Sequence, residues 1–259
     1  MNGIVLARRD FRESDQIISI LTAEAGKQDY IARGVKKITS KNAAHLEPCS
    51  LISFGSVAGK ELAYLTNVQS VQFFSQIRQS LKKMHLASYT TDALNRVLQQ
   101  NTHERDMYYL FFSWLEFLER IDDEHVRLLL LDAFLIKLFS LLGFHPILEE
   151  CVVCDKTFKE IGAVQINSGG AKKPRFYFAG GGIVCHEDAQ KKKKIGEQLL
   201  QCGLQEMSSM SFLLRSDWKD ILLYTIETAE YQHLHTLIFE FVLYHSEQKW
   251  EDWKKFLLK

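Results

Sequence analysis

Residues 3–72 alternate between short apolar runs and short polar segments, which is the pattern of β-strands joined by turns. Gly26 fits a tight turn because glycine tolerates positive φ, and residues 58–61 fit a hairpin turn. The pattern predicts strands at residues 4–7, 16–21, 28–32, 51–57 and 62–69, with a long polar loop at 33–48. Five such strands favour a small closed barrel of the OB type, and a small SH3-like barrel fits nearly as well.

From residue 75 the apolar positions recur at the spacing of an α-helix. The pattern predicts helices at residues 81–98, 108–118, 125–142, 188–200, 208–214 and 232–245, and short strands at 163–166 and 175–178. The segment 125–142 is apolar on several faces, which indicates a central helix, and Gly143 and Pro146 end it.

The composition is that of a packed globular protein, with 46% hydrophobic and 25% charged residues in a chain of 259. Its five cysteines, an odd number, argue against a secreted disulfide scaffold. The N-terminus resembles neither a signal peptide nor an anchor. The longest apolar region, 128–144, contains Asp132 and Lys137, which a membrane span would bury at high cost. We therefore expect a cytoplasmic protein that does not enter a membrane.

Charge is distributed unevenly, although the formal net charge is zero. Residues 1–80 hold ten Lys and Arg against seven Asp and Glu, whereas residues 101–150 hold four against ten. This asymmetry predicts two regions with different partners.

Cysteine spacing predicts a metal site. Cys151 and Cys154 form a Cys-x-x-Cys pair, which supplies two zinc ligands in suitable geometry, and Cys185 can supply a third. Asp188 stands where a second such pair would place its fourth cysteine, and can supply an oxygen ligand. His186 is the other candidate, although adjacent ligands to one metal are geometrically awkward. The alternative is a site that holds no metal, with the cysteines packed as small core residues.

Residues 30–41 combine cations with an aromatic side chain and small polar groups. Phosphates attract Lys and Arg, and exposed bases stack on flat side chains. Together with the cations nearer the N-terminus, this loop predicts a DNA-binding face on the barrel, made of Arg8, Arg9, Arg12, Lys27, Arg33, Lys36, Lys37 and Lys41. An ordinary solvated loop is the alternative, because the charge excess is small. Two further basic segments, 172–175 and 191–194, either contact a phosphate backbone or are solvated ends.

Sequence signatures of common enzymes are absent. The chain has no Gly-x-x-x-x-Gly-Lys-Ser/Thr, no dinucleotide-binding fingerprint after a strand and no Gly-x-Ser-x-Gly. The glycines at 180–182 are better explained by a tight turn that delivers Cys185. We therefore predict a protein that is not an enzyme.

Short blocks occur in a specific order along the chain. They include Arg-Arg-Asp-Phe-Arg-Glu-Ser-Asp at 8–15, Ala-Arg-Gly-Val-Lys-Lys at 32–37, Leu-Glu-Pro at 46–48, Leu-Leu-Gly-Phe-x-Pro at 141–146, the Cys-x-x-Cys pair and Gly-Gly-Ile-Val-Cys at 181–185. In this order they resemble the RecO family of bacterial DNA-repair recombination mediators. The resemblance covers residues 3–245 and departs at Asp188, where cysteine-bearing members have their fourth ligand.

The resemblance implies an α+β fold with an OB-fold DNA-binding domain at 1–78 and a mainly helical domain at 79–259. A zinc-ribbon-like insertion is expected at about 147–190, with zinc held by Cys151, Cys154, Cys185 and Asp188. It also implies binding to single- and double-stranded DNA, annealing of complementary strands and loading of recombinase. The expected partners are RecR and the C-terminal tail of the single-stranded-DNA-binding protein, and the expected location is the nucleoid.

Two other classes remain. A zinc-supported protein–protein adaptor without annealing activity is favoured by the acidic segment 101–150. A metal-dependent hydrolase would need an open coordination position and turnover, and no residue near the cysteines supplies a clear general base.

Overall fold

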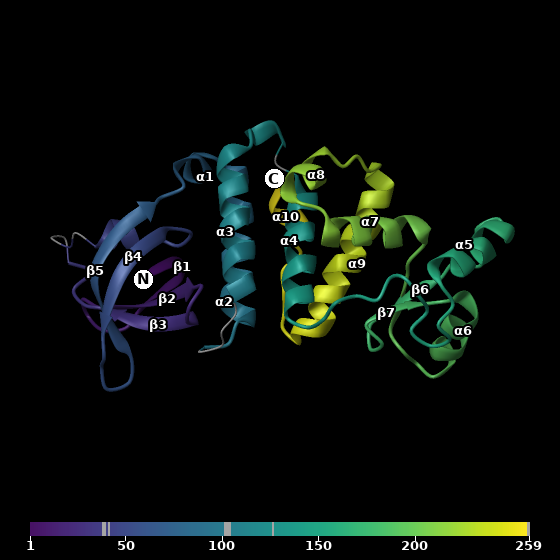
Figure 1. Cartoon of the computed structure of the whole chain (residues 1–259), viewed down its shortest axis with the longest axis horizontal. Coiled ribbons are helices and arrows are strands. Elements are labelled where there is room, and N and C mark those ends of the chain that lie inside the picture. Colours follow the sequence, from purple (N-terminus) through teal and green to yellow (C-terminus); the bar gives the residue numbers. More distant parts are fainter. Residues whose placement is uncertain (38–39, 41, 101–104, 126, 258–259) are drawn as a thin grey trace. The chain divides into compact units, whose positions relative to one another are not determined.

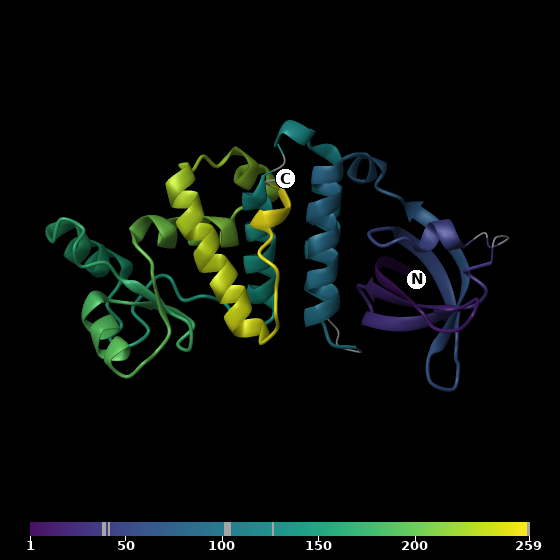
Figure 2. The same cartoon turned by 180° about the vertical axis from the view of Figure 1, so that it is seen from behind.

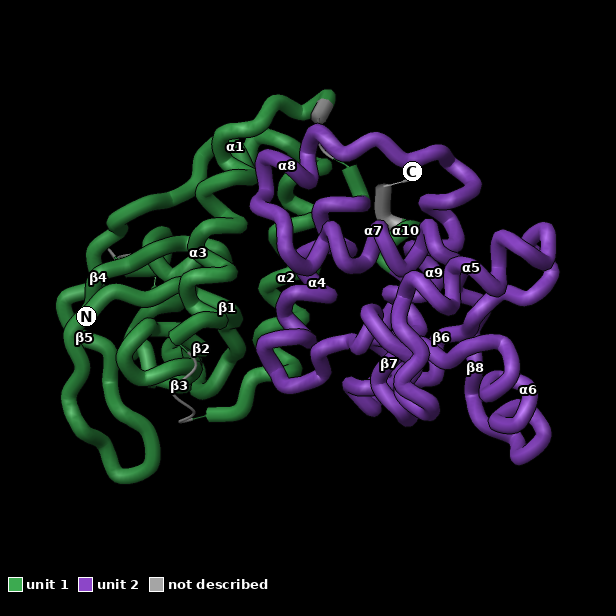
Figure 3. The backbone as a smooth tube through the Cα atoms, turned by 45° about the vertical axis from the view of Figure 1, so that its right-hand side comes forward, with its two compact units in different colours: residues 1–128, 253–259 green, residues 129–252 purple. Residues whose placement is uncertain are grey.

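The computed structural model describes residues 1–37, 40, 42–100, 105–125 and 127–257, and the chain divides into two compact units (Figure 3). Unit 1 comprises residues 1–128 and 253–259, and unit 2 comprises residues 129–252. The predicted domain boundary at residues 78–79 falls within unit 1, in the last turn of the short helix α1 (Ser75–Gln79) that follows the barrel. As a division into domains it stays a prediction.

Unit 1 begins with a closed five-stranded barrel, shown in purple and blue in Figure 1. Its strands are β1 (Asn2–Asp10), β2 (Gln16–Thr22), β3 (Gly26–Ala32), β4 (Leu51–Val57) and β5 (Ala63–Gln72), with a 3₁₀ turn, η1, at Ala43–Leu46. The strand order is β1-β2-β3-β5-β4, closing on β1, and only the β3–β5 pair is parallel among these strands. The predicted OB-like barrel and its strands are confirmed.

Apolar side chains at alternate positions of the strands fill the interior of the barrel. Ile18 and Ile20 on β2, and Ile52 and Phe54 on β4, are two residues apart and point to the same face, and all four are buried in one cluster. Tyr30 joins them with its ring edge against Phe54, at 5.2 Å between centroids. Burial of this apolar set fixes the register of each strand, since a shift by one residue would turn the set towards solvent.

Helices complete unit 1: α1 (Ser75–Gln79), α2 (Leu81–Val97), α3 (Arg105–Arg120) and α10 (Lys254–Leu257), with a 3₁₀ turn, η2, at Asp123–His125. The Ser80 side chain accepts a hydrogen bond from the backbone N–H of Lys83 and so caps the start of α2. The Trp114 indole on α3 donates to the Thr90 hydroxyl on α2, at 3.2 Å. Trp253, just before α10, lies against Tyr89 of α2, which links the C-terminal segment to this unit. Figure 2 shows the chain from behind, with the C-terminal segment in yellow.

Unit 2 is built on α4 (Leu128–Leu141), whose side chains are buried on nearly every face, as the apolar run predicts. The other helices are α5 (Phe158–Asn167), α6 (His186–Lys194), α7 (Leu204–Arg215), α8 (Trp218–Leu223) and α9 (Thr228–Ser246). A small antiparallel sheet, ordered β7-β6-β8, consists of β6 (Arg175–Tyr177), β7 (Gly182–Val184) and β8 (Leu199–Gln201). Within the described ranges, no helix is both long and apolar enough to span a membrane.

Two sequence predictions in unit 2 are wrong. Residues 163–166, predicted as a strand, lie in α5, because Thr157 and Glu160 form a capping box that starts a helix here. The predicted helix 188–200 ends at Lys194, since Gly196 adopts a left-handed conformation (φ 82°) and the chain then pairs as β8 with β6.

Candidate metal centre and nucleic-acid interface

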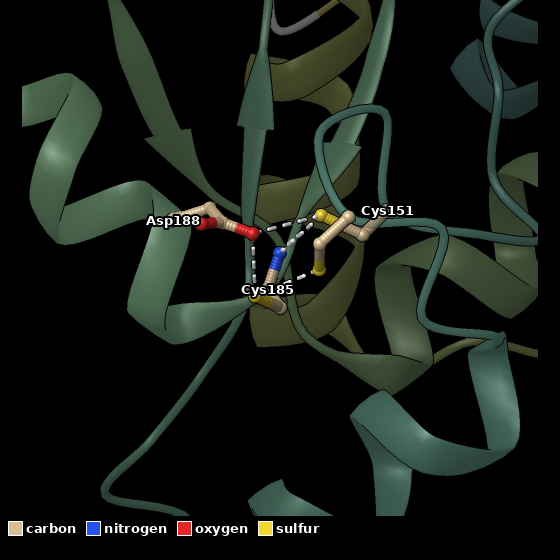
Figure 4. Close-up of side chains that lie close together, drawn as sticks. Cys151, Cys185 and Asp188 are labelled. Carbon is tan, nitrogen blue, oxygen red and sulfur yellow. Dashed lines mark hydrogen bonds between the residues drawn. The ribbon is translucent and has the colours of Figure 1, made fainter.

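The predicted metal ligands converge within unit 2 (Figure 4). Cys185 is the residue before α6, and Asp188 lies in the first turn of that helix. The loop that carries Cys151 runs beside β7, because the backbone N–H of Val152 donates to the Ile183 carbonyl. The N–H of Cys185 donates to Cys151 Sγ at 3.3 Å, which brings the two cysteines together.

The ligand atoms have the spacing of a tetrahedral zinc site. One atom from each of Cys151, Cys154, Cys185 and Asp188 lies within 4.8 Å of all the others. Zinc bonds of ~2.3 Å to sulfur and ~2.0 Å to oxygen place tetrahedral neighbours ~3.8 Å (S···S) and ~3.5 Å (O···S) apart. The Cys154 and Cys185 sulfurs are 3.8 Å apart, and Asp188 Oδ2 lies 3.2 Å from Cys185 Sγ and 3.6 Å from Cys151 Sγ. The residues therefore fit zinc with three sulfur ligands and one oxygen ligand.

Protonation in the cluster favours neutral thiols beside an ionised carboxylate. A hydrogen bond to Asp188, helped by burial, raises the pKa of the Cys154 thiol to about 12. Burial raises the pKa of Cys185. Hydrogen bonds from Cys154 and Lys191 hold the pKa of Asp188 well below its usual range. A metal that binds here must displace thiol protons, whereas the carboxylate already carries its charge.

Lys191 separates the roles of the two Asp188 oxygens. Its ammonium donates to Oδ1 at 2.8 Å, while Oδ2 faces the sulfurs of Cys151 and Cys185. The Asp188 side chain is 5% exposed, so this contact leaves its carboxylate little freedom to turn. The geometry thus presents a single oxygen to the metal position.

His186 does not belong to the cluster of candidate ligand atoms, although it is adjacent to Cys185. It borders a hollow that it shares with Arg175 and Gln201. Cys49 and Cys202 are also outside it, each buried elsewhere. Asp188 is thus the fourth member of the group that the structure brings together.

The second candidate site is one rim of the barrel. Asp10 at the end of β1 pairs with Gln16 at the start of β2, and Gln16 pairs with Ala32 at the end of β3. The N–H of Lys36 donates to the Ser14 carbonyl at 3.1 Å, which joins the β1–β2 turn to the segment after β3. The cations of both segments therefore gather at this rim.

Several predicted DNA-binding cations already have acidic partners. Arg8 pairs with Glu47, Arg9 with Asp29 and Lys36 with Asp10, each at 2.7 Å. These pairs lower the positive charge that the rim presents to a phosphate.

Lys27 occupies a different environment from the one predicted. It is 8% exposed, and its ammonium donates to the carbonyls of Asn95 and Leu98 at the end of α2. A lysine there complements the negative end of the helix. The prediction that Lys27 contacts phosphate is corrected on this ground, because the buried ammonium has protein acceptors.

Two exposed arginines at the rim lie over aromatic rings. The Arg33 guanidinium is 3.7 Å from the Tyr64 ring centroid, and that of Arg12 is 4.9 Å from the Phe11 ring. Neither arginine, nor the exposed Lys37, has an acidic partner among the described residues. Lys41, also predicted to bind DNA, lies outside the described residues. The sequence did not identify Tyr64 as part of this rim. Tyr64 lies on β5, far from Arg33 in the sequence, and only the pairing of β5 with β3 at Tyr30 and Ile31 brings the two together.

An OB-like barrel with cations at its rim, followed by a helical region with a cysteine cluster, defines the class of the chain. The family model described as Recombination protein O N terminal matches residues 1–74, and Recombination protein O C terminal matches residues 78–253. The chain belongs to the RecO family, which the sequence blocks predicted.

Curated relatives cover much of the chain. A protein of Symbiobacterium thermophilum named DNA repair protein RecO is 31% identical over 217 residues, covering 84% of this chain and 80% of the relative. A protein of the same name from Caldanaerobacter subterraneus is 26% identical over 262 residues, covering 99% and 96%. The chain therefore belongs with proteins of DNA repair and recombination.

Proposed function

We propose that the protein is a non-enzymatic DNA-binding mediator of recombinational repair, acting at the nucleoid. The observation that carries this proposal is the pair of exposed arginines, Arg12 and Arg33, each over an aromatic ring at one rim of the barrel. Cations attract phosphates without regard to sequence, and ring faces stack on any base.

Annealing of complementary strands is the finer part of the proposal. It requires that backbone charge be neutralised while base edges stay free to pair. The rim offers cations and flat rings in contact with one another, a combination that suits sequence-tolerant binding. By family, RecR and the acidic C-terminal tail of the single-stranded-DNA-binding protein are the proposed partners in loading recombinase.

We also propose that the cysteine cluster holds zinc in a structural role. With Cys151, Cys154, Cys185 and Asp188 as ligands, all four tetrahedral positions are taken, so no position is left for a substrate. The zinc would fix the loop of Cys151 to the start of α6. The metal-dependent hydrolase is not supported by this arrangement.

The DNA-binding proposal is tested by neutralising the unpaired cations of the rim. In the full chain, Arg12→Gln, Arg33→Gln and Lys37→Gln together should weaken binding of a single-stranded oligonucleotide. The slope of log affinity against log salt should become shallower by about 0.7 for each phosphate that the variant no longer neutralises. Fluorescence anisotropy at several salt concentrations measures both quantities.

The matched control removes the same charge from exposed sites elsewhere: Lys60→Gln, Lys82→Gln and Lys219→Gln. It should bind DNA like the unaltered protein. Equal affinity and slope in the rim variant would overturn the assignment.

A protein–protein adaptor is the second candidate, favoured by the acidic partners of Arg8, Arg9 and Lys36. Strand-annealing rates measured with the purified protein separate the two functions. A mediator accelerates annealing and loses this effect in the rim variant, whereas an adaptor leaves the spontaneous rate unchanged.

A further inference from the structure

A hollow beside the small sheet of unit 2 is bordered by basic and neutral polar side chains, together with Gly170, Ala171 and Pro174. It has a volume of about 200 Å³ and is bordered by Lys173, Arg175, His186 and Gln201. One water takes up ~30 Å³ of the liquid, so a tetrahedral oxyanion fits here together with several waters. No acidic residue borders the hollow among the residues described.

The fold brings these side chains together from separate segments. Arg175 on β6 pairs with Gln201 on β8 and with Val184 on β7, and His186 follows two residues after Val184. Lys173 follows the turn after α5, in which Gly169 and Gly170 have positive φ values of 61° and 83°. The cluster is therefore a product of sheet pairing rather than of one local run of cations.

The side chains at this hollow have unused hydrogen-bonding capacity. Within the described residues, those of Lys173, Arg175, His186 and Gln201 have no hydrogen-bond or ion-pair partner. Lys191 and Lys156, by contrast, are committed to Asp188 and Glu187. Arg175 can offer a planar fork of donors, which matches two oxygens of one phosphate, and Lys173 adds a second positive charge.

We propose that this hollow is a phosphate-binding site, distinct from the barrel rim. Its ligand is a phosphate group, either on the backbone of a nucleic acid or free in solution. Two positive charges without a carboxylate select an anion, and the amide of Gln201 adds a neutral donor. Two larger hollows, of about 340 Å³ and 640 Å³, are bordered by acidic residues, including Glu149 and Glu119, so they lack this selectivity.

The test uses the full chain and inorganic phosphate, with chloride at matched ionic strength as the reference. Binding is followed through the broadening of the ³¹P resonance of phosphate. Gln201→Glu places a negative charge at the hollow with almost no change of shape, and should abolish most of the broadening. Lys173→Gln with Arg175→Gln should have the same effect.

Matched controls make the same chemical changes away from the hollow. Gln190→Glu, and Lys193→Gln with Lys194→Gln, alter exposed side chains of α6 that do not border it. They should retain the broadening of the unaltered protein. Because Gln201 is exposed, its variant should keep the melting temperature, and loss of binding then reports on the site. No broadening with the unaltered protein, or equal broadening in the Gln201 variant and its control, would overturn the proposal.

A second arm identifies the source of the phosphate. An unlabelled oligonucleotide is added to the phosphate-bound protein. Disappearance of the broadening identifies a nucleic-acid backbone as the ligand, and its persistence identifies a free phosphate. Both results preserve a phosphate site, and neither depends on the arginines of the barrel rim.

Discussion

At the scale of single residues, Asp188 decides the character of the cysteine cluster. Its Oδ2 stands at tetrahedral distance from two sulfurs, while its Oδ1 is held by Lys191. In the proposed zinc site a carboxylate, which is a harder ligand than a thiolate, would bind zinc less strongly than a fourth cysteine. The Asp188–Lys191 contact would offset part of that weakness by holding the ligand oxygen in place.

Replacement of this ligand should alter zinc affinity in both directions. Asp188→Cys supplies a fourth thiolate and should raise the affinity roughly tenfold or more, and Asp188→Ala should lower it as much. Competition with a chromophoric chelator measures the affinity. Identical zinc affinity in the three proteins would contradict the assignment of Asp188 as a ligand.

Lys191 should matter only where Asp188 is present. Lys191→Met should lower zinc affinity roughly tenfold, because partners that orient a ligand typically contribute that much. In the Asp188→Cys background the same change should have almost no effect, which a double-mutant cycle detects. Lys193→Met, on the exposed face of α6, is the control and should be neutral in both backgrounds.

At the scale of elements, Lys27 was expected at a DNA-binding face but instead donates hydrogen bonds to the C-terminal end of α2. The ammonium of Lys27, on β3, accounts for two carbonyls at the C-terminal end of α2. It therefore links the barrel to the helix that follows it within unit 1. A charge pattern alone cannot reveal this role, since the acceptors lie 68 and 71 residues away.

Loss of the Lys27 ammonium should affect stability rather than DNA binding. Lys27→Met leaves buried carbonyls without their donor and should lower the free energy of unfolding by about 1–3 kcal/mol. Urea denaturation measures this change, and oligonucleotide affinity should be retained. Lys37→Met, at an exposed cation of the rim, should show the opposite pattern: unchanged stability and weaker DNA binding. A stable Lys27→Met protein with impaired DNA binding would contradict this assignment.

Two elements of unit 2, α5 and β8, show where the local sequence pattern does not predict the secondary structure. The sequence Ala-Val-Gln-Ile at 163–166 alternates like a strand, yet the capping box of Thr157 and Glu160 makes it part of α5. The capping signal is present in the sequence and outweighs the alternation, because it satisfies backbone N–H groups that a helix start leaves free. The β8 pairing, in contrast, depends on where β6 lies in the folded chain.

At the scale of the whole molecule, each unit has its own core, and unit 2 contains a buried charged network. His235 of α9 contacts Asp132 of α4 and Asp252 of the following segment, each at 2.9 Å. The Tyr231 hydroxyl also donates to Asp132, at 2.8 Å. Burial lowers the pKa of His235, but its hydrogen bonds with both carboxylates and their charges outweigh burial and raise it above 6.5.

This network should make the stability of unit 2 depend on pH. A raised pKa in the folded protein means that folding favours protonated His235. Its contribution is therefore complete below pH 6.5 and is lost as the pH rises through the folded pKa. The free energy of unfolding should decrease across this window, as measured by urea denaturation at a series of pH values.

Substitutions separate this effect from other titrations. His235→Gln should remove the decrease, and at pH 6 should destabilise the protein by about 3–5 kcal/mol, because the buried carboxylate of Asp132 loses the positive charge of His235. His245 provides a comparison, because its pKa is shifted in the opposite direction to that of His235. Burial lowers its pKa, and its ring stacks against Phe144 at 4.7 Å, so its contribution is lost as the pH falls below 6.5. An unaltered pH profile in His235→Gln would rule out the network as the cause.

The sequence by itself determined the barrel, the central helix and the Cys-x-x-Cys pair of the candidate metal centre, because these depend on short-range patterns. Alternation of apolar residues suffices for β1 to β5, an apolar run for α4, and a Cys-x-x-Cys turn for Cys151 and Cys154. Only the tertiary structure decided which of the described cations have acidic partners and which side chains share a site. The partners of Arg9 and Lys27, and the hollow beside Arg175, join residues far apart in the chain. Such charges find their partners only when packing fixes the distances between them.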